Sequence, residues 1–326
     1  MNFGTIIAYI KYVRIYIAFF KSATNRKIGM VLLMEYLHKE RRSETLDKVY
    51  KFGNELLKEI EGTSLPEGFV SVWYLGQSSM LVKYLNKYAI FDPHLEDSLS
   101  KRPVNPSIRN YPSPLDPAHC DFLDYVFISH NHADHLEGAT IEKIAKCNSK
   151  VKFIIPAPEK AALTGIGVEN SRIIPAHSEK ETLLDGLSFT AIPAAHYELN
   201  LDENGDAPAV GYVVRFGDLT VYHAGDTVVY PGMIEKLRKH SINIAMIPIN
   251  GRDYRRDARN CIGNTSFREA ADLCSDINGD LLIPMHYDLY NHNTENPAFL
   301  VDYLYSNHRG MKFHLFQPGE RFIYSV

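Results

Sequence analysis

Cysteine is scarce in this sequence of 326 residues. The four cysteines, Cys120, Cys147, Cys261 and Cys274, include no CxxC pair and are too few to cross-link a chain of this length. This excludes a disulfide-stabilised secreted scaffold and a thiolate metal site, and it predicts a reducing, cytoplasmic location.

Positive charge is also in short supply. The 35 lysines and arginines are outnumbered by 39 aspartates and glutamates, which gives a formal net charge of -4. Proteins that bind nucleic acid normally carry a broad basic surface, so no nucleic-acid partner is expected. With 45% hydrophobic and 23% charged residues, the composition excludes a mainly disordered, collagen-like or coiled-coil architecture.

A long uncharged apolar run is missing as well. The amino-terminal segment is apolar, aromatic and basic, but Lys11 and Arg14 divide the stretch between Phe3 and Phe20. A spanning helix needs about 20 predominantly apolar residues, so the divided stretch argues against a span, and the same charges argue against a signal peptide. Three interpretations stay open for residues 1–33: a start-site artefact outside the native protein, a helix that contacts a membrane surface or a partner, and a span.

The rest of the chain predicts a helical extension, residues 1–65, followed by one catalytic domain, residues 66–326. Apolar residues recur at helical spacing in 35–61, and the period changes after Pro66. A proline-rich passage, 103–117, is expected to be a surface loop with no core of its own.

Alternating short apolar runs predict a layered α/β protein with two sheets. The runs at 70–75, 80–85 and 88–91 predict a meander of strands with tight turns. Further strands are expected at 125–129, 152–155, 188–192, 209–216, 219–222, 242–248, 281–284, 312–316 and 321–324. Helices are expected at 140–147, 159–163, 233–240, 266–274 and 297–305.

Histidine, by contrast, is abundant, and three of the 14 histidines lie in the segment SHNHADH, residues 129–135. The segment directly follows an apolar run and precedes an expected helix, so its side chains extend from a rigid strand end. His130 and His132 alternate along the chain and can point to one ion, whereas Asp134 and His135 follow the turn and can serve a second. Because histidine is the commonest metal ligand, this cluster predicts a metal site rather than an ordinary polar loop.

Three later residues occupy the same kind of position. His196, Asp226 and His286 each come just past an apolar run. Loops at strand ends often carry function, so all three are candidate ligands. Taken singly, each also has a structural interpretation: a strand cap, a turn residue after Gly225, and a core histidine.

The segment SHNHADH resembles the HxHxDH signature of the metallo-β-lactamase superfamily, and the three later residues follow in the family's order. The resemblance covers roughly residues 68 to 325. The blocks WYLGQSSMLVK, IFDPHL, PAAHY, YHAGDT, PINGRD, PMHYDLYNHNTENP and QPGERF are similar to the UlaG-like branch, which contains L-ascorbate-6-phosphate lactonase. The resemblance implies a four-layer αβ/βα sandwich of the metallo-β-lactamase type, here with an N-terminal helical extension.

The resemblance also implies a site with two divalent metal ions, zinc or manganese, with iron as a third option. The implied ligands of the first ion are His130, His132 and His196. The implied ligands of the second ion are Asp134, His135 and His286, and Asp226 bridges both.

Two such ions would share a water and present it as hydroxide, so no serine or cysteine nucleophile is needed. Asp134 is the expected catalytic residue, because it can hold the proton of that hydroxide. His223 is expected either to support a ligand or to pack at a strand end.

Substrate contacts are expected at the same edge of the sheets. Arg252 follows a strand and Gly251, and its guanidinium can bind a phosphate or carboxylate through two hydrogen bonds. Other expected lining residues are Asn250, Asn264, Tyr287 and Asn291.

These features predict a metal-dependent hydrolase that uses a metal-activated hydroxide on a small anionic ester or lactone, similar to the ascorbate-phosphate lactonases. The alternative is a metal-dependent phosphodiesterase acting on a phospholipid or a nucleic acid. A non-catalytic metal-binding protein is disfavoured by the full ligand set. The oligomeric state stays open, with a homo-oligomer among the alternatives.

Overall fold

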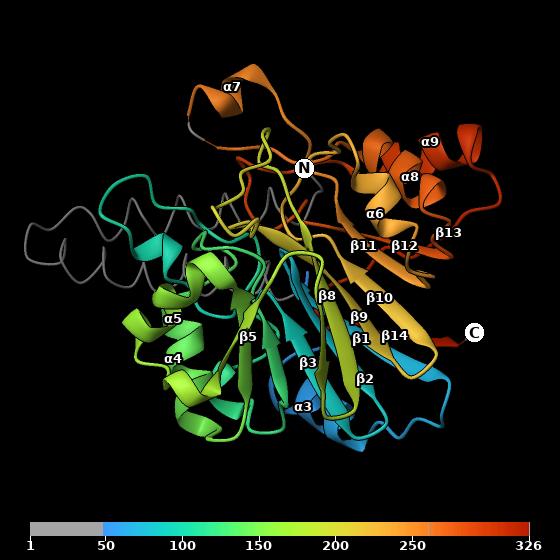
Figure 1. Cartoon of the computed structure of the whole chain (residues 1–326). Coiled ribbons are helices and arrows are strands. Elements are labelled where there is room, and N and C mark those ends of the chain that lie inside the picture. The colour runs from blue at the N-terminus through green and yellow to red at the C-terminus, as the bar shows by residue number, and fades with distance from the viewer. Residues whose placement is uncertain (1–47, 260, 326) are drawn as a thin grey trace, which may run out of the picture. The chain divides into compact units, whose positions relative to one another are not determined.

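The computed structural model describes residues 48–259 and 261–325. Residues 49–326 form one compact unit (Figure 1). The interpretations of residues 1–33, and residues 35–47 of the helix expected at 35–61, lie outside the described residues. The last part of that helix is present as α3 (Gly53–Gly62), whereas residues 48–52, which the expectation included, are turn and irregular structure.

The first sheet combines antiparallel and parallel strands. Its strands are β1 (Phe69–Gly76), β2 (Ser79–Tyr84), β3 (Lys87–Phe91), β4 (Tyr125–Phe127), β5 (Lys152–Pro156), β6 (Ile173–Ala176) and β14 (Arg321–Ser325). They lie in the order β14-β1-β2-β3-β4-β5-β6. Pairing is antiparallel from β14 to β3, which confirms the expected meander, and parallel from β3 to β6.

The second sheet repeats this division. Its strands are β7 (Glu181–Leu184), β8 (Leu187–Pro193), β9 (Val210–Phe216), β10 (Leu219–His223), β11 (Ile244–Pro248), β12 (Leu281–Met285) and β13 (Lys312–Phe313). They lie in the order β13-β12-β11-β10-β9-β8-β7. Pairing is parallel from β13 to β10 and antiparallel from β10 to β7, so this sheet is mixed as well.

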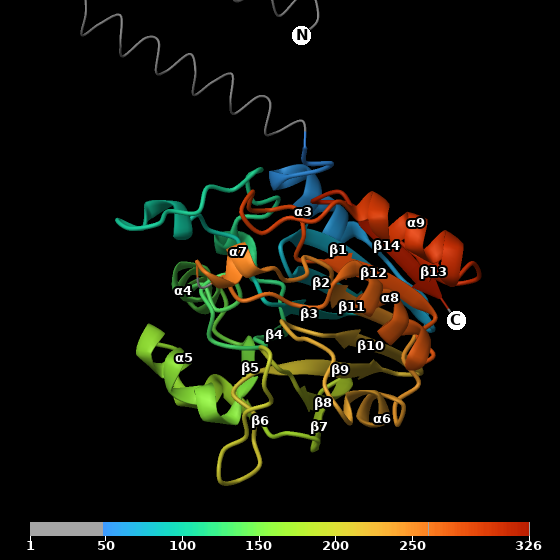
Figure 2. The same ribbon diagram turned by 90° about the horizontal axis from the view of Figure 1, so that it is seen from above.

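Helices cover both outer faces. On one side lie α4 (Gly138–Cys147) and α5 (Lys160–Ile166), and on the other lie α6 (Met233–Leu237), α8 (Phe267–Asp276) and α9 (Pro297–Asn307) (Figures 1 and 2). The layers therefore run helix, sheet, sheet, helix, as the expected αβ/βα sandwich requires.

Side-chain alternation along the first sheet explains this layering. In β1, Val72 and Tyr74 belong to the core between the sheets, whereas Trp73 and Leu75 belong to a second core. That second core also contains buried residues of α3, α4 and α5. Because successive strand residues point to opposite faces, a strand buried on both faces contributes to two cores.

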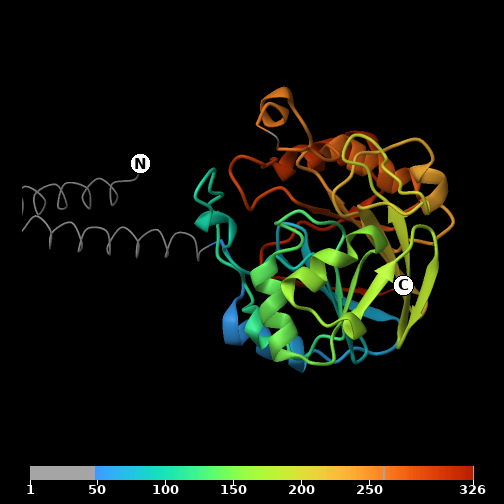
Figure 3. The ribbon, with the colours of Figure 1, turned by 60° about the vertical axis from the view of Figure 1, so that its left-hand side comes forward.

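Three elements were not expected from the sequence. β6 and β7 are edge strands, each paired with one neighbour, and β6 contains Pro175, which an edge position tolerates. The third is α7 (Tyr254–Asp257), a single turn in an arm that projects from the second sheet (Figures 1 and 3). The strand expected at 312–316 is shorter, because only Lys312 and Phe313 pair with β12.

The proline-rich passage differs from its expectation. It is irregular and bears two short 3-10 turns, Leu99–Lys101 and Pro117–His119, at its ends. However, Tyr111 and Leu115 are buried, and Tyr111 packs in a small cluster with Tyr290. The passage therefore contributes to a core and forms a fixed wall beside the loop after β12.

No helix within the described residues is long and apolar enough to cross a membrane.

Candidate metal centre

The loop after β4 carries the segment SHNHADH into a tight turn. The backbone N–H groups of His135 and Leu136 donate to the carbonyl oxygen of His132, at 3.0 and 2.7 Å. This turn directs the side chains on both sides of it toward the neighbouring ends of β8, β10 and β12. His196, Asp226 and His286 follow those three strands, so the two sheets bring all of these residues to one edge.

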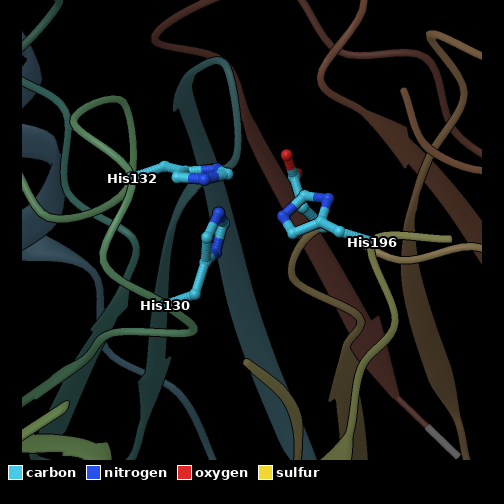
Figure 4. A group of neighbouring side chains, drawn as sticks. His130, His132 and His196 are labelled. Atoms are coloured by element: carbon cyan, nitrogen blue, oxygen red, sulfur yellow. The ribbon is translucent and has the colours of Figure 1, made fainter. Parts of the chain in front are cut away.

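The first group of candidate ligands contains His130, His132, His196 and Asp226. One ligand atom from each lies within 4.8 Å of the others. The ring centroid of His196 is 5.0 Å from that of His130 and 4.9 Å from that of His132. The three rings converge on one space from two different loops (Figure 4).

The second group contains Asp134, His135 and His286, again with ligand atoms within 4.8 Å of one another. Asp226 faces both groups: its Oδ1 is 3.2 Å from His135 Nε2, and its Oδ2 is 3.5 Å from His286 Nε2. The structure thus brings all seven predicted ligands together, with Asp226 between the two groups.

Unsatisfied polar atoms show that this arrangement suits a cation. His130 Nε2 and both ring nitrogens of His196 are buried and have no hydrogen-bond partner among the described residues. Buried polar atoms of folded proteins are normally paired, so unpaired lone pairs that face a shared space fit a site that binds a cation. Imidazole and carboxylate donors without a thiolate suit zinc, manganese or iron.

Left-handed backbone occurs both just before Asp226 and at His286. Gly225, with φ +61°, precedes Asp226, and a Cβ there would lie 2.7 Å from the Ser129 Cβ and 2.8 Å from the Val210 oxygen. Only glycine fits this close approach between the two sheets. His286 adopts φ 61° without being glycine, a costly conformation that is often found at functional sites.

Asp92, which sequence reasoning missed as a site residue, orients the motif from beneath. Its Oδ1 accepts from the Ser129 N–H at 2.7 Å, and its Oδ2 accepts from Ser129 Oγ at 2.6 Å. His135 Nδ1 lies 2.7 Å from the same Oδ2. Since a carboxylate only accepts hydrogen bonds, His135 Nδ1 carries the proton, and His135 Nε2 faces Asp226. Metal-binding histidines usually have such a carboxylate on the ring nitrogen that does not bind the metal. In the sequence, the feature that could have indicated this role is the block IFDPHL, which contains Asp92.

Gln77 is a second missed residue. Its side-chain nitrogen lies 2.8 Å from Asp134 Oδ2 and 2.9 Å from His286 Nε2. Its backbone oxygen accepts from the His286 N–H at 2.8 Å. This buried amide therefore holds two candidate ligands, Asp134 and His286, in place. In the sequence, the feature that could have indicated this role is the block WYLGQSSMLVK, which contains Gln77.

His223 packs at the strand end and supports the loop before Asp226. Its Nε2 donates to the Ser78 carbonyl at 2.8 Å, and its Nδ1 accepts from the Gly225 N–H at 3.3 Å. Its ring stacks on Phe91 with centroids 5.1 Å apart.

Two imidazoles of the first group, those of His130 and His196, stay neutral. Burial holds the pKa of His130 well below its ordinary value, and nearby His135 adds to the effect. Burial also lowers the pKa of His196 to about 4. Neutral imidazole is the form that binds a metal, so these two rings are ready to act as ligands.

In the second group, neighbouring opposite charges determine the direction in which the pKa values shift. Burial lowers the pKa of His135, but Asp226, Asp134 and Asp92 outweigh it and hold that pKa well above its ordinary value. Burial would raise the pKa of Asp226, yet His135 and His286 hold it well below the ordinary value. The carboxylates of Asp226 and Asp134 are therefore charged, and a bound cation would replace the protons that His135 and His286 direct toward it.

The candidate ligands open into a cavity of about 1240 Å³, which is lined by His132, Asp134, Asp226 and His286 among others. Of the five predicted substrate contacts, Asn291 is in this lining. Asn250 and Asn264 are buried behind it, with the Asn264 amide donating to Asn250 Oδ1 at 3.1 Å. Tyr287 is buried in the core that also contains Val72 and Tyr74.

Arg252 is placed differently from its expectation. Its guanidinium makes two hydrogen bonds to Glu269, of 3.0 and 2.6 Å, and the lining formed by the described residues does not include it. Instead, the arm around α7 brings Arg255, Arg256 and Arg259 to the cavity, and the proline-rich passage adds Arg102. From the sequence, Arg252 is the functional candidate in its loop cluster, and Arg255 and Arg256 are expected on a solvated surface. Arg102 and Arg259 carry no sequence signal, because the sequence does not show where the arm and the proline-rich passage lie.

Comparisons with known proteins agree with this geometry. A family model described as Beta-lactamase superfamily domain matches residues 90–287. The UPF0173 metal-dependent hydrolase of Thermofilum pendens is 28% identical over 246 residues, which are 73% of this chain and 96% of that protein.

Two solved structures illustrate the likeness of fold. Igni18, a metallo hydrolase from the archaeon Ignicoccus hospitalis, is similar with a TM-score of 0.59 and 21% identity, covering 79% of this chain and 99% of that one. YhfI of Bacillus subtilis, a metallo-β-lactamase fold protein, is similar with a TM-score of 0.57 and 12% identity, covering 78% and 100%. The two mixed sheets described above are those of the metallo-β-lactamase fold.

Proposed function

Because the chain belongs to the β-lactamase superfamily and is a metal-dependent hydrolase of it, we propose that it cleaves a small anionic ester or lactone with a metal-activated hydroxide. The observation that carries the proposal is the pair of ligand groups on either side of Asp226. When bound there, two divalent ions, zinc or manganese with iron as a third option, would polarise the scissile bond and lower the pKa of a shared water.

The protein's own residues would divide the remaining tasks. His130, His132 and His196 would hold one ion, and Asp134, His135 and His286 the other, with Asp226 between them. Asp134 is the catalytic residue of this proposal. Its side chain is 23% exposed and lines the cavity, so it can reach both an ion and the proton of the attacking hydroxide.

Arginines that line the cavity support an anionic substrate. Arg102, Arg255 and Arg259 line the cavity, and no carboxylate lies within 4.0 Å of them in the described parts of the chain. Arg256, by contrast, is paired with Asp253 and bonded to Asn293. Guanidinium groups without a partner bind carboxylate and phosphate groups through paired hydrogen bonds.

The finer assignment to lactonase-type chemistry, similar to the UlaG-like branch, is supported by the sequence blocks quoted above. A phosphodiesterase is the second candidate function, and the same arginines favour it because they would also bind a diester. All four cysteines are free, which supports the proposed location in the reducing cytoplasm.

The test is to remove metal with a chelator, restore manganese or zinc, and assay carboxylic esters, sugar lactones, phosphodiesters and RNA. We expect metal-dependent turnover of anionic esters or lactones, and its loss in Asp226→Ala with an unchanged circular dichroism spectrum. Turnover confined to diesters would favour the second candidate. Full activity in Asp226→Ala would contradict the metal-hydroxide mechanism.

A further inference from the structure

Gln77 lies in the tight turn between β1 and β2 and has an uncommon backbone conformation. Its φ is 55°, in the left-handed region that glycine and asparagine adopt more readily than glutamine. Its carbonyl oxygen accepts from the backbone N–H of His286, which is left-handed as well. A glutamine where the backbone favours a smaller residue indicates that the side chain itself has a function.

The side chain of Gln77 ends among the ligands of the second group. Gln77 is 1% exposed, yet it belongs to the lining of the cavity together with Asp134 and His286. Its terminal nitrogen lies 2.8 Å from Asp134 Oδ2 and 2.9 Å from His286 Nε2. The same His286 Nε2 lies 3.3 Å from Asp134 Oδ2 and 3.5 Å from Asp226 Oδ2. The amide therefore contacts the atoms through which the second group converges.

The spacing of these atoms is that of donors around one ion. Two donors that bind an ion at about 2.1 Å lie about 3.0 Å apart when their bonds are at right angles, and about 3.4 Å apart in a tetrahedron. Within the second group, the distances of 3.3 Å between His286 and Asp134 and of 3.2 Å between His135 and Asp226 fall in this range. The distances of 2.8 and 2.9 Å from the terminal atom of Gln77 are close to the right-angle value.

The amide has an oxygen that can take this place. A half-turn about the last side-chain bond exchanges the nitrogen and the oxygen and leaves the shape of the group unchanged. With the nitrogen inward, Gln77 donates to Asp134 and His286. A cation would attract the oxygen instead, because the amide oxygen has free lone pairs and the NH₂ group only donates.

We propose that Gln77 is a further ligand of the second ion, bound through its side-chain oxygen. This inference rests on the two-metal site of the proposed function. With Asp226, the second ion then has five protein ligands, three of them oxygens. Such a set suits manganese, whereas zinc is satisfied by three or four protein ligands.

A supporting role is the competing explanation. In that role, the Gln77 nitrogen only donates to Asp134 and holds the carboxylate in place. The two roles predict opposite effects for Gln77→Glu, because a carboxylate cannot donate a hydrogen bond but is a good ligand. Glutamate has nearly the same length and shape as glutamine, so this variant changes the chemistry of the terminal group and not its place.

The test is calorimetric titration of metal-free protein with manganese at neutral pH. The binding step that remains in His196→Ala, which removes a ligand of the first group, identifies the second ion. We expect Gln77→Glu to bind this ion about tenfold or more tightly than the native protein, because affinity rises with the number of charged ligands.

The matched control is Asn105→Asp, which adds the same charge at an exposed position of the same cavity lining. It separates a general attraction for cations from direct binding. We expect it to change the affinity for the second ion by less than about 3-fold, because solvent and salt screen an exposed charge.

Gln77→Asn tests the preference for manganese. Asparagine has an amide and suits the left-handed turn, but it is one carbon shorter than glutamine. Loss of a residue that merely supports a ligand costs about 10- to 100-fold in affinity, and we expect at least that loss for the second manganese ion. Zinc should lose less than about 3-fold, because four ligands remain. An unchanged circular dichroism spectrum checks the fold.

Weaker manganese binding in Gln77→Glu, or equal gains in Gln77→Glu and Asn105→Asp, would overturn the ligand role and leave the proposed hydrolase standing. Equal losses of manganese and zinc in Gln77→Asn would overturn the preference for manganese. A native protein that binds no divalent ion would overturn both the inference and the proposed function. A crystal structure of manganese-loaded protein is the direct check: we expect Gln77 Oε1 bonded to the second ion, and an amide turned away from that ion would contradict the proposal.

Discussion

At the scale of single residues, the presence or absence of a carboxylate partner distinguishes arginines with a structural role from arginines that can bind a ligand. Arg252 and Arg255 are three positions apart, yet Arg252 is held by Glu269 at the start of α8, whereas Arg255 has no carboxylate partner among the described residues and faces the cavity. A guanidinium with a fixed carboxylate partner has little left to offer a ligand.

The first prediction follows from that difference. The double variant Arg255→Gln, Arg259→Gln should raise KM for an anionic ester by about 30-fold or more, because each of the two lost charged hydrogen bonds costs about 1 kcal/mol or more. KM for a neutral ester of the same alcohol should stay unchanged. Arg252→Gln, the control, should lower stability without raising KM. The same rise for both esters would contradict anion binding by these arginines.

The second prediction concerns Glu137 and acid. Its pKa of about 2 lies below the ordinary value of 4.5, so the folded state binds its proton more weakly than the unfolded state does. Its contribution to stability, on the order of 3 kcal/mol, is therefore present above about pH 4.5 and is lost as the pH falls toward 2.

The test is urea unfolding of metal-free protein at pH 6 and pH 3.5. Glu137→Gln should lower the unfolding free energy at pH 6 and lower it less at pH 3.5. Glu142→Gln is the control, since Glu142 lies on the same helix but on its surface, paired with Lys146. A stability loss in Glu137→Gln that does not change with pH would contradict the assigned charge state.

Clustering explains which site residues the sequence could predict. The segment SHNHADH places metal-binding side chains so close together that the metal site can be read from spacing alone. Asp92 and Gln77 are single polar residues at strand ends, and only their contacts distinguish them from turn residues. Asn250 and Arg252 lie at the edge of the sheets where the sequence predicts substrate contacts. However, both side chains are hydrogen-bonded to residues of later segments, Asn293 and Glu269, and the sequence does not show this pairing.

At the scale of elements, burial determines which ones the sequence reveals. Strands buried on both faces, such as β8 and β12, are continuous apolar runs that can be recognised. The edge strand β7 is half-exposed, and β6 contains a proline, so neither has that signal. The turn α7 is too short for apolar residues to recur at helical spacing.

The third prediction concerns α3, whose packing ties it to the outer face of the first sheet. Leu56 is fully buried in the core that contains Trp73, whereas Leu57, its neighbour, is only partly buried. Leu56→Ala should lower the unfolding free energy by about 2–5 kcal/mol, the usual range for a buried leucine. Leu57→Ala should cost less than half as much. Equal losses, measured by urea unfolding, would contradict the packing of α3.

At the scale of the whole molecule, the two sheets bring the loops that follow their strands to one edge. The candidate ligands come from the loops after β4, β8, β10 and β12, so neither sheet alone supplies both groups. Asp226 joins the groups, and the close approach at Gly225 lets the two sheets meet there. The site is therefore a product of the sandwich as a whole.

The central claim is that this edge holds two divalent ions that together support hydrolysis. Its most direct test is a titration of metal-free protein with manganese or zinc, with bound metal and ester turnover measured in the same samples. We predict that binding saturates at two ions per chain, that turnover rises to its maximum at the same point, and that Asp226→Ala loses both. Equal turnover in metal-free protein, or full turnover with Asp226→Ala, would contradict the account.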